Sequence, residues 1–218
     1  MSVLLYGNWR SLATYRVRVA LKLKKIAFQE TMIDLPSGEH FSEAFNAINP
    51  QHAVPALIHN GALITQSSAI LEYLDEAFTN SPLLPADAIG RARVRALAQI
   101  SIADTHPLTV LRVRKYLASE LSLDDAAQTK WARHWLDLSS AALEAHLTAK
   151  GSATSLFAHG DTPTIADVAL ASHMFGVRFF GANTSLAPKL CEITERCFAL
   201  PAFSEADPTK QPGAPGVN

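Results

Sequence analysis

The chain is poor in cysteine and carries almost no net charge. Among its 218 residues are two cysteines, Cys191 and Cys197, and 19 Lys and Arg residues against 20 Asp and Glu residues leave a formal charge of −1. Helical spacing would place the two thiols on different faces, so we expect them to be buried and free of any disulfide. A charge near zero creates no field that would attract nucleic acid.

Long hydrophobic runs and common ligand motifs are also missing. No apolar stretch reaches the roughly 18 residues that a membrane-spanning helix needs, and the N-terminus lacks the basic flank of a signal peptide. The eight histidines form no H-E-x-x-H pattern, and the glycines form no G-x-G-x-x-G or P-loop pattern. We therefore expect a cytoplasmic protein with no metal site, no nucleotide site and no membrane or nucleic-acid partner.

The composition that remains is that of a globular protein, with 48% hydrophobic and 18% charged residues and enough length for two cores. In the N-terminal part, short apolar runs alternate with segments of helical periodicity. The expected elements are strands at 3–6, 28–33, 56–58 and 62–65 and helices at 16–24, 42–48 and 67–77. Their order, β-α-β-α-β-β-α, resembles an α/β domain of the thioredoxin-like type, which we place at residues 1–80.

The remainder of the chain follows a different pattern. The segment 80–85 is rich in helix breakers and predicts a linker. Beyond it, apolar residues recur at three- and four-residue spacings over 91–117, 123–149 and 164–180. We therefore expect an all-helical domain at residues 86–204. Proline and glycine are frequent in 205–218, which predicts a flexible tail.

The segment between the first strand and the first helix carries a hydroxyl where an anion would be stabilised. Ser11 follows Arg10 in this segment. The unpaired N–H groups and partial positive charge of a helix N-terminus stabilise an anion by about 0.3–1 kcal/mol at exposed sites. A bound thiol would ionise more easily there. The alternative interpretation is that Ser11 or Thr14 only caps the helix.

Two further segments of the first domain are suited to a peptide ligand. Val54-Pro55 lies between a helix and a hairpin, where the residue before the proline can offer its backbone to an extended peptide. Gln66-Ser67 opens the next helix and can hold a carboxylate through a hydroxyl, backbone N–H groups and the helix dipole. The alternatives are a simple loop ending at Pro55 and a simple cap at Ser67.

In the second domain, a proline and two arginines interrupt the helical pattern. His106-Pro107 predicts a kink, which is often found at a functional or packing constraint. Arg112 follows, and Arg178 stands on a later helix beside aromatic residues. With Arg10, these two guanidinium groups would suit a dicarboxylate. The alternative for Arg178 is a side chain packed on apolar surface.

Taken together, these motifs resemble the zeta class of the glutathione transferases. The resemblance spans about residues 3–200 and rests on Arg10-Ser11, 15–21, Asn49-Pro50 with Val54-Pro55, 66–74 and 160–167, the last with a Thr-x-x-Asp capping box. It implies glutathione as cofactor and a homodimer. It further implies that Ser11, Arg10 and His106 are catalytic and that glutathione is bound by Ser11, His40, Val54, Pro55, Gln66, Ser67 and His106. Arg10, Arg112 and Arg178 would bind the substrate.

The function implied by the resemblance is glutathione-dependent cis–trans isomerisation of a maleyl keto acid. One alternative is a transferase that conjugates, dehalogenates or cleaves an ether in a small electrophile. A third hypothesis is a glutathione-binding module without turnover, because Leu12-Ala13 stands where the zeta pattern usually has a Cys or Thr.

Overall fold

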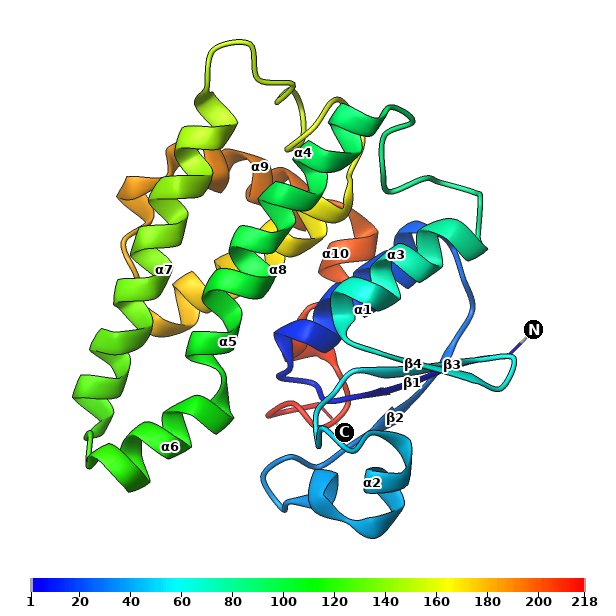
Figure 1. Cartoon of the computed structure of the whole chain (residues 1–218), viewed down its shortest axis with the longest axis vertical. Coiled ribbons are helices and arrows are strands. Elements are labelled where there is room, and N and C mark those ends of the chain that lie inside the picture. The colour runs from blue at the N-terminus through cyan, green and yellow to red at the C-terminus, as the bar shows by residue number, and fades with distance from the viewer. Residues whose placement is uncertain (1, 218) are drawn as a thin grey trace. The chain divides into compact units, whose positions relative to one another are not determined.

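The structure is a computed structural model that describes residues 2–217 (Figure 1). The chain divides into two compact units. The first unit contains the residues up to Leu83 and those from Leu200 onward, and the second contains Leu84–Ala199. This division differs from the expected domains, 1–80 and 86–204, because the chain returns to the first unit after residue 199.

The first unit is built on a four-stranded mixed sheet in the order β2-β1-β3-β4. Its strands are β1 (Val3–Gly7), β2 (Gln29–Met32), β3 (Ala56–His59) and β4 (Ala62–Thr65). Strand β1 pairs in parallel with β2 and antiparallel with β3, which pairs antiparallel with β4. Helices α1 (Leu12–Leu23) and α3 (Ser67–Ala77) lie over one face, and α2 (Glu43–Ile48) lies on the other (Figure 1). The predicted thioredoxin-like order is confirmed.

Local sequence explains these elements. Strand β1 alternates buried and partly exposed residues, as a strand with one face on a core does. Asn60 and Gly61 both have positive φ, the conformation that the tight turn between β3 and β4 requires. Helix α3 buries Ile70, Leu71 and Leu74, which recur at helical spacing and cover the sheet.

Helix α1 buries two of its charged side chains. All residues from Thr14 to Leu21 are buried, including Arg16 and Arg18. The charges are accommodated because each guanidinium has polar partners inside the unit: Arg16 contacts Ser67 and Arg18 pairs with Glu30. Periodicity could not separate a solvated arginine from a buried one, because that difference depends on distant partners.

The second unit is built from helices, as predicted, and the only other regular feature among its described residues is an isolated β-bridge between Thr154 and Gly160. Helix α8 (Ile165–Phe180) forms its centre, with an almost continuous run of buried side chains. Its start carries the predicted capping box: the buried Asp167 accepts hydrogen bonds from the Thr164 backbone N–H and hydroxyl, both at 2.8 Å. The other helices of the unit are α4 (Ala88–Gln99), η2 (Ile100–Thr105), α5 (His106–Thr109), α6 (Leu111–Leu121), α7 (Asp125–Thr148), η3 (Thr184–Leu186) and α9 (Pro188–Phe198).

The helix expected at 91–117 is broken near its middle. Residues Ile100–Thr105 form a π-helical turn, followed by Pro107 in the first turn of α5. Proline has no N–H and its ring displaces the carbonyl one turn earlier, so the regular hydrogen-bond ladder cannot continue. The Thr105 hydroxyl instead donates to the Ile100 carbonyl at 2.8 Å. The predicted kink therefore takes the form of a π-turn.

The segment after residue 204 also differs from the expected flexible tail. Helix α10 (Pro201–Ser204) and the turn η4 (Pro208–Lys210) fold onto the first unit. Ala206 and Ala214 are buried, and Gln211 Nε2 donates to the Glu205 and Asp207 carbonyls at 2.8 and 2.9 Å. Small residues are buried here by close contact with the rest of the unit, which a proline- and glycine-rich pattern does not reveal. Residue 218 lies outside the described residues.

Candidate functional site

Three loops of the first unit meet at one edge of its sheet. Tyr6, near the end of β1, pairs with Ala56 at the start of β3, and Ala56 pairs with Thr65 at the end of β4. The residues just beyond these pairs therefore emerge at the same edge. This sheet edge brings together three predicted elements of the site, Ser11, Val54-Pro55 and Gln66-Ser67.

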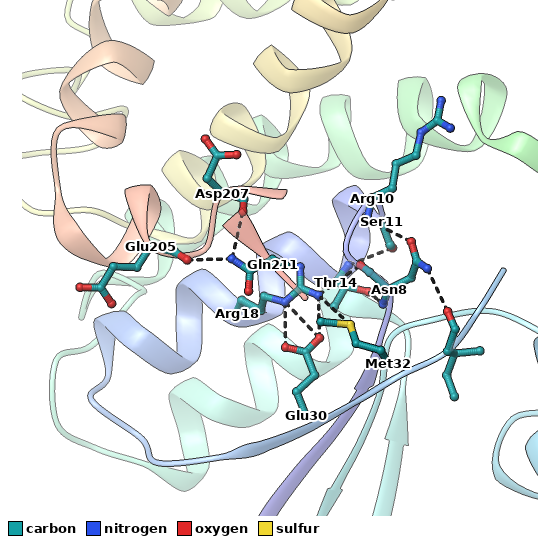
Figure 2. Close-up of polar contacts among 11 residues, drawn as sticks. Asn8, Arg10, Ser11, Thr14, Arg18, Glu30, Met32, Glu205, Asp207 and Gln211 are labelled. Carbon is teal, nitrogen blue, oxygen red and sulfur yellow. Dashed lines mark hydrogen bonds and ion pairs between the residues drawn. The ribbon is translucent and has the colours of Figure 1, made fainter. Parts of the chain in front are cut away.

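Ser11 caps helix α1 and keeps a hydrogen available for a ligand (Figure 2). Its Oγ accepts the backbone N–H of Thr14 at 3.1 Å. A hydroxyl has two acceptor lone pairs and one donor, so the capping bond leaves the O–H free to donate. The cap interpretation and the thiolate interpretation are therefore compatible. Thr14 is buried and its Oγ1 accepts from Asn8 N, so its hydroxyl serves the loop.

The loop before Ser11 is anchored from below by an ion pair between the buried Arg18 and the partly buried Glu30. Arg18 Nη2 lies 2.6 Å from Glu30 Oε1 and also donates to the Asn8 carbonyl at 3.2 Å. The Asn8 side chain donates to the Ile33 carbonyl, and its oxygen accepts the Arg10 N–H. Figure 2 shows these side chains converging beneath the start of α1, while the Arg10 side chain extends away from them. The loop is held by contacts on both of its flanks.

Val54-Pro55 has the form expected of a peptide-binding segment. The Val54–Pro55 peptide bond is cis. Val54 is partly exposed and lies before the first residue of β3. Among the described residues, no hydrogen bond is formed by its backbone N–H and C=O. These groups are therefore available to pair with an extended peptide in the manner of an added strand.

Gln66 and Ser67 open α3 in an unusual backbone conformation. Gln66 has φ +67° and ψ +118°, a region that residues other than glycine adopt rarely and that clusters at ligand clamps. Its Nε2 donates to Gln51 Oε1 at 2.8 Å. Ser67 Oγ accepts two hydrogen bonds from Arg16, through Nε at 3.1 Å and Nη2 at 3.0 Å. Burial lowers the pKa of Arg16 to about 9, so its guanidinium is still charged at neutral pH.

His40 lies in the turn η1 (Glu39–Phe41), before α2. Its ring lies 4.0 Å from the ring of Phe41, centroid to centroid, and its backbone carbonyl is 2.9 Å from Nδ1 of His52. Phe41 is 63% exposed and also lies against the His52 ring. The turn thus presents an aromatic group on the surface of the first unit. The assignment of His40 to the glutathione site remains a prediction.

The three second-unit residues lie on separate helices. His106 follows the π-turn at the start of α5, and Arg112 is exposed on α6. Arg178, on α8, forms an ion pair with Glu195 and stacks over the Phe198 ring at 4.6 Å. The surroundings of Arg178 match the alternative interpretation of a side chain packed on aromatic surface.

Both cysteines are free. Cys197 is buried as expected, but Cys191 is partly exposed, which the expectation of two buried thiols did not foresee. Burial raises the pKa of both thiols, which favours the unreactive protonated form. Within residues 2–217, no group of three metal-binding side chains comes together. In the same part of the chain, no helix is both long enough and apolar enough to cross a membrane.

Sequence reasoning missed the buried polar side chains that support the site. Asn8, Arg16 and Arg18 are buried and each contacts a residue of the predicted site or its loop, and the partly buried Glu30 pairs with Arg18. The only sequence signal was an excess of arginine in an otherwise apolar helix. A charged residue inside an apolar helix needs a buried partner, and a single sequence does not identify it.

Comparison with known proteins identifies the family of the chain. Residues 1–76 match the model of the glutathione S-transferase N-terminal domain. The chain is 39% identical to a maleylpyruvate isomerase from Ralstonia over 208 residues, which cover 95% of this chain and 98% of the relative. It is 37% identical to a probable maleylacetoacetate isomerase from Vibrio cholerae, over 98% of this chain and 99% of the relative.

Solved structures give the same result over the whole length. A bacterial maleylpyruvate isomerase described as a zeta-class glutathione S-transferase matches with a TM-score of 0.93 and 38% identity, covering 97% of this chain and 99% of that one. A maleylacetoacetate isomerase from Methylobacterium extorquens, solved with malonate and glutathione, matches with a TM-score of 0.94 and 43% identity, covering 98% and 100%. The chain belongs to the glutathione S-transferase family of enzymes, in its zeta class.

Proposed function

We propose that this chain is a glutathione-dependent cis–trans isomerase of a maleyl keto acid, such as maleylpyruvate or maleylacetoacetate. The observation that carries the proposal is the Ser11 hydroxyl, which stands at a helix start with its oxygen bound to the Thr14 N–H and its hydrogen available for a ligand. Full-length similarity to isomerases of these names supports the same assignment. The partners would be glutathione and a small acidic substrate.

The residues of the first unit fit glutathione by their chemistry. The Val54 backbone, followed by Pro55, suits the extended peptide. Ser67 and the start of α3 suit a carboxylate, next to the strained Gln66. His40 is a further candidate contact, and Ser11 suits the sulfur. Two related isomerases were solved with glutathione bound, which supports this donor set.

Bound glutathione would supply a thiolate that adds reversibly to the cis double bond, so that the bond can rotate before the thiolate leaves. The chain's own residues would stabilise the negative charges on the sulfur and on the substrate. Ser11 would donate a hydrogen bond that favours the ionised sulfur and lowers the pKa of the thiol. Arginine side chains would bind the carboxylates and stabilise the negative charge that develops on the substrate. His106 would orient glutathione or transfer a proton.

Arg10, Arg112 and Arg178 are the proposed carboxylate-binding residues. We expect Arg112→Gln to lower kcat/KM for a maleyl acid by about ten- to hundred-fold, the cost of one charged hydrogen bond, with little change in glutathione affinity. Arg10→Gln is expected to do the same. Arg178→Gln is the most informative of the three variants, because the ion pair with Glu195 competes with a substrate carboxylate for the Arg178 guanidinium. Equal losses of turnover and glutathione affinity would count against a substrate role for any of the three.

The deciding experiment follows the loss of maleylpyruvate or maleylacetoacetate absorbance with and without glutathione. We expect isomerisation only when glutathione is present, with a trans product that a fumaryl hydrolase accepts. Ser11→Ala, tested in parallel, separates turnover by the site from slow uncatalysed addition of glutathione. If the wild-type chain shows no rate above the uncatalysed reaction with either acid, the isomerase assignment is wrong.

A glutathione transferase that acts by conjugation, dehalogenation or ether cleavage is a second candidate. It is favoured by the ion pair of Arg178 with Glu195, which competes with a substrate carboxylate, and by Leu12-Ala13 after Ser11. Such a reaction uses the same activated thiol on a neutral carbon and needs no arginine set. A higher kcat/KM for neutral electrophiles than for maleyl acids would support this candidate over the isomerase.

We also propose that the chain works as a homodimer in the cytoplasm. Family membership is the support for both statements. Light scattering coupled to size-exclusion chromatography should then give twice the chain mass of 23.6 kDa. A mass of one chain at micromolar concentration would contradict the dimer, and recovery of the native protein outside the cytoplasmic fraction would contradict the location.

A further inference from the structure

Arg16 is a fully buried cation directly behind the first residue of α3. It lies on α1, 2% exposed, within the run from Thr14 to Leu21 in which every residue is buried. Its Nε and Nη2 both donate to Ser67 Oγ, at 3.1 and 3.0 Å. Two bonds from one guanidinium to one hydroxyl oxygen define the orientation of that hydroxyl more strictly than a single bond would.

These two bonds determine whether the Ser67 hydroxyl donates or accepts a hydrogen bond with a ligand. A serine hydroxyl has one hydrogen to donate and two lone pairs that accept. Both bonds from Arg16 arrive at the oxygen, and a guanidinium has no acceptor atom to receive the hydroxyl hydrogen. The hydrogen of Ser67 must therefore point to a different acceptor. Without Arg16, the hydroxyl could rotate and use its oxygen toward other groups, as helix-start serines do when they cap.

The positive charge of Arg16 also favours an anion beside Ser67. Ser67 occupies the first position of α3, where N–H groups without helical partners and the helix dipole already favour an anion. A buried cation behind this point strengthens the preference, because charges interact more strongly away from water. An arginine serves this purpose better than a lysine, since its fork makes two directed bonds and holds its charge when buried.

We propose that Arg16 is a positioning residue for the γ-glutamyl carboxylate of glutathione, acting through Ser67. It would hold the Ser67 hydroxyl as an obligatory donor and place a positive charge behind the carboxylate. This inference rests on the proposed binding of glutathione and adds a residue that does not itself contact the ligand. The competing explanation is that Arg16 only ties α1 to α3 and supports the fold.

Calorimetry with two ligands separates these explanations. One ligand is glutathione, and the other is its analogue in which the α-carboxylate of the γ-glutamyl residue is replaced by hydrogen. We expect Arg16→Lys to weaken glutathione binding about ten-fold and to weaken binding of the analogue less than about two-fold, because a lysine loses one of two charge-assisted bonds. Equal weakening of both ligands would show structural support alone and would overturn the role of Arg16.

A matched control comes from the same helix. Arg18 is also buried, but it pairs with Glu30 and not with Ser67. Arg18→Lys should therefore weaken both ligands by the same factor, whatever that factor is. If Arg18→Lys shows the carboxylate-dependent loss as well, the effect belongs to buried charge in general and the specific role of Arg16 is wrong. Circular dichroism and unfolding midpoints establish that each variant is folded.

A double-mutant cycle tests whether Ser67 carries the effect. In Ser67→Ala, the hydroxyl that Arg16 orients is gone, so adding Arg16→Lys should cost glutathione affinity less than about three-fold. A full ten-fold loss in that background would mean that Arg16 does not act through Ser67. If the wild-type chain binds glutathione weakly and does not distinguish it from the analogue, the proposed glutathione site itself fails, which differs from failure of Arg16 alone.

Discussion

At the scale of single residues, one hydroxyl can serve both the fold and the chemistry. Ser11 caps α1 by accepting the Thr14 N–H, and the same bond leaves its hydrogen for a sulfur. We expect Ser11→Ala to raise the pKa of bound glutathione and to lower kcat/KM by about 10²–10³, the cost of one preorganised donor. The thiolate's ultraviolet absorbance, titrated against pH, measures the first effect.

Ser42 provides the control for that experiment. It caps α2 in the same way, accepting the Phe45 N–H at 3.2 Å, but it is not at the sheet edge that holds Ser11. Each serine-to-alanine change should cost about 1 kcal/mol of stability through the lost cap. Only Ser11→Ala should shift the thiol pKa. Equal shifts in both variants would mean that the cap, and not the donor, controls the sulfur.

Protonation of His173, in the core of the second unit, makes stability depend on pH. It is buried, its Nε2 lies 3.0 Å from Ser140 Oγ, and burial lowers its pKa from 6.5 to about 4. Between these values the unfolded chain binds a proton that the folded chain does not, so stability falls as the pH falls. Below about pH 4 the accumulated loss reaches about 3 kcal/mol.

The contribution of His173 is best measured as the difference in stability between the wild type and a His173 variant. Asp167, on the same helix, has the opposite pH dependence and would mask that contribution in the wild type alone. Burial raises the pKa of Asp167 to about 6, which favours folding as the pH falls toward 4. Relative to wild type, His173→Gln should therefore gain about 3 kcal/mol in free energy of unfolding between pH 7 and pH 4. Urea unfolding at both pH values tests this, and a difference that does not change with pH would exclude His173 as the cause.

At the scale of elements, helix α8 depends on the polar groups at its start. Asp167 accepts hydrogen bonds from the Ala158 N–H and from the backbone and hydroxyl of Thr164, all within the buried interior. We expect Asp167→Asn to destabilise the protein by about 2–4 kcal/mol, because an amide has one acceptor oxygen where the carboxylate uses two. The NH₂ group at the other position leaves a buried N–H unsatisfied. The free energy of urea unfolding is the measurement.

Asp124, which caps a helix at an exposed position, provides the control for Asp167→Asn. Asp124 caps α7 by accepting the Ala127 N–H at 2.8 Å, and this bond is exposed. Asp124→Asn should cost less than about 1 kcal/mol, since asparagine caps as well as aspartate and water satisfies any freed group. If both variants lose the same small amount, burial does not amplify the contribution of Asp167.

At the scale of the whole molecule, the first unit is completed by residues that come last in the sequence. The segment from Leu200 buries Ala206 and Ala214 and forms the Lys22–Glu205 ion pair with α1. At Gly213, φ is +86° and an added Cβ would lie 3.3 Å from Cδ1 of Trp9, in the loop that leads to Ser11. The end of the chain thus covers part of the loop that leads to the site.

Deleting residues 205–218 should therefore destabilise the first unit by a few kcal/mol, from the lost apolar burial, and change the environment of Trp9. Deleting only residues 215–218 retains Ala214 and should cost less than about 1 kcal/mol. Unfolding midpoints and tryptophan fluorescence measure both effects. A full deletion with wild-type stability and fluorescence would restore the expectation of a flexible tail.

Features that depend on residues close together in the sequence could be predicted without a structure. The seven elements of the first domain, the hairpin at Asn60-Gly61 and the capping box at Thr164 all follow from periodicity, turn chemistry or capping preferences. The π-turn before His106 could be foreseen only as a kink at Pro107, because its form depends on which hydroxyl or carbonyl takes over the broken bonds.

Sequence was sufficient for the family, the order of elements and the residues Ser11, Val54 and Ser67 as candidates, since each rests on short-range pattern or motif. The fold was needed to show that these three lie at one sheet edge and that Arg16 stands behind Ser67. It was also needed to place Arg178 on Glu195 and the last residues on the first unit. The partner of a buried charge lies far away in the chain, and only tertiary packing selects it.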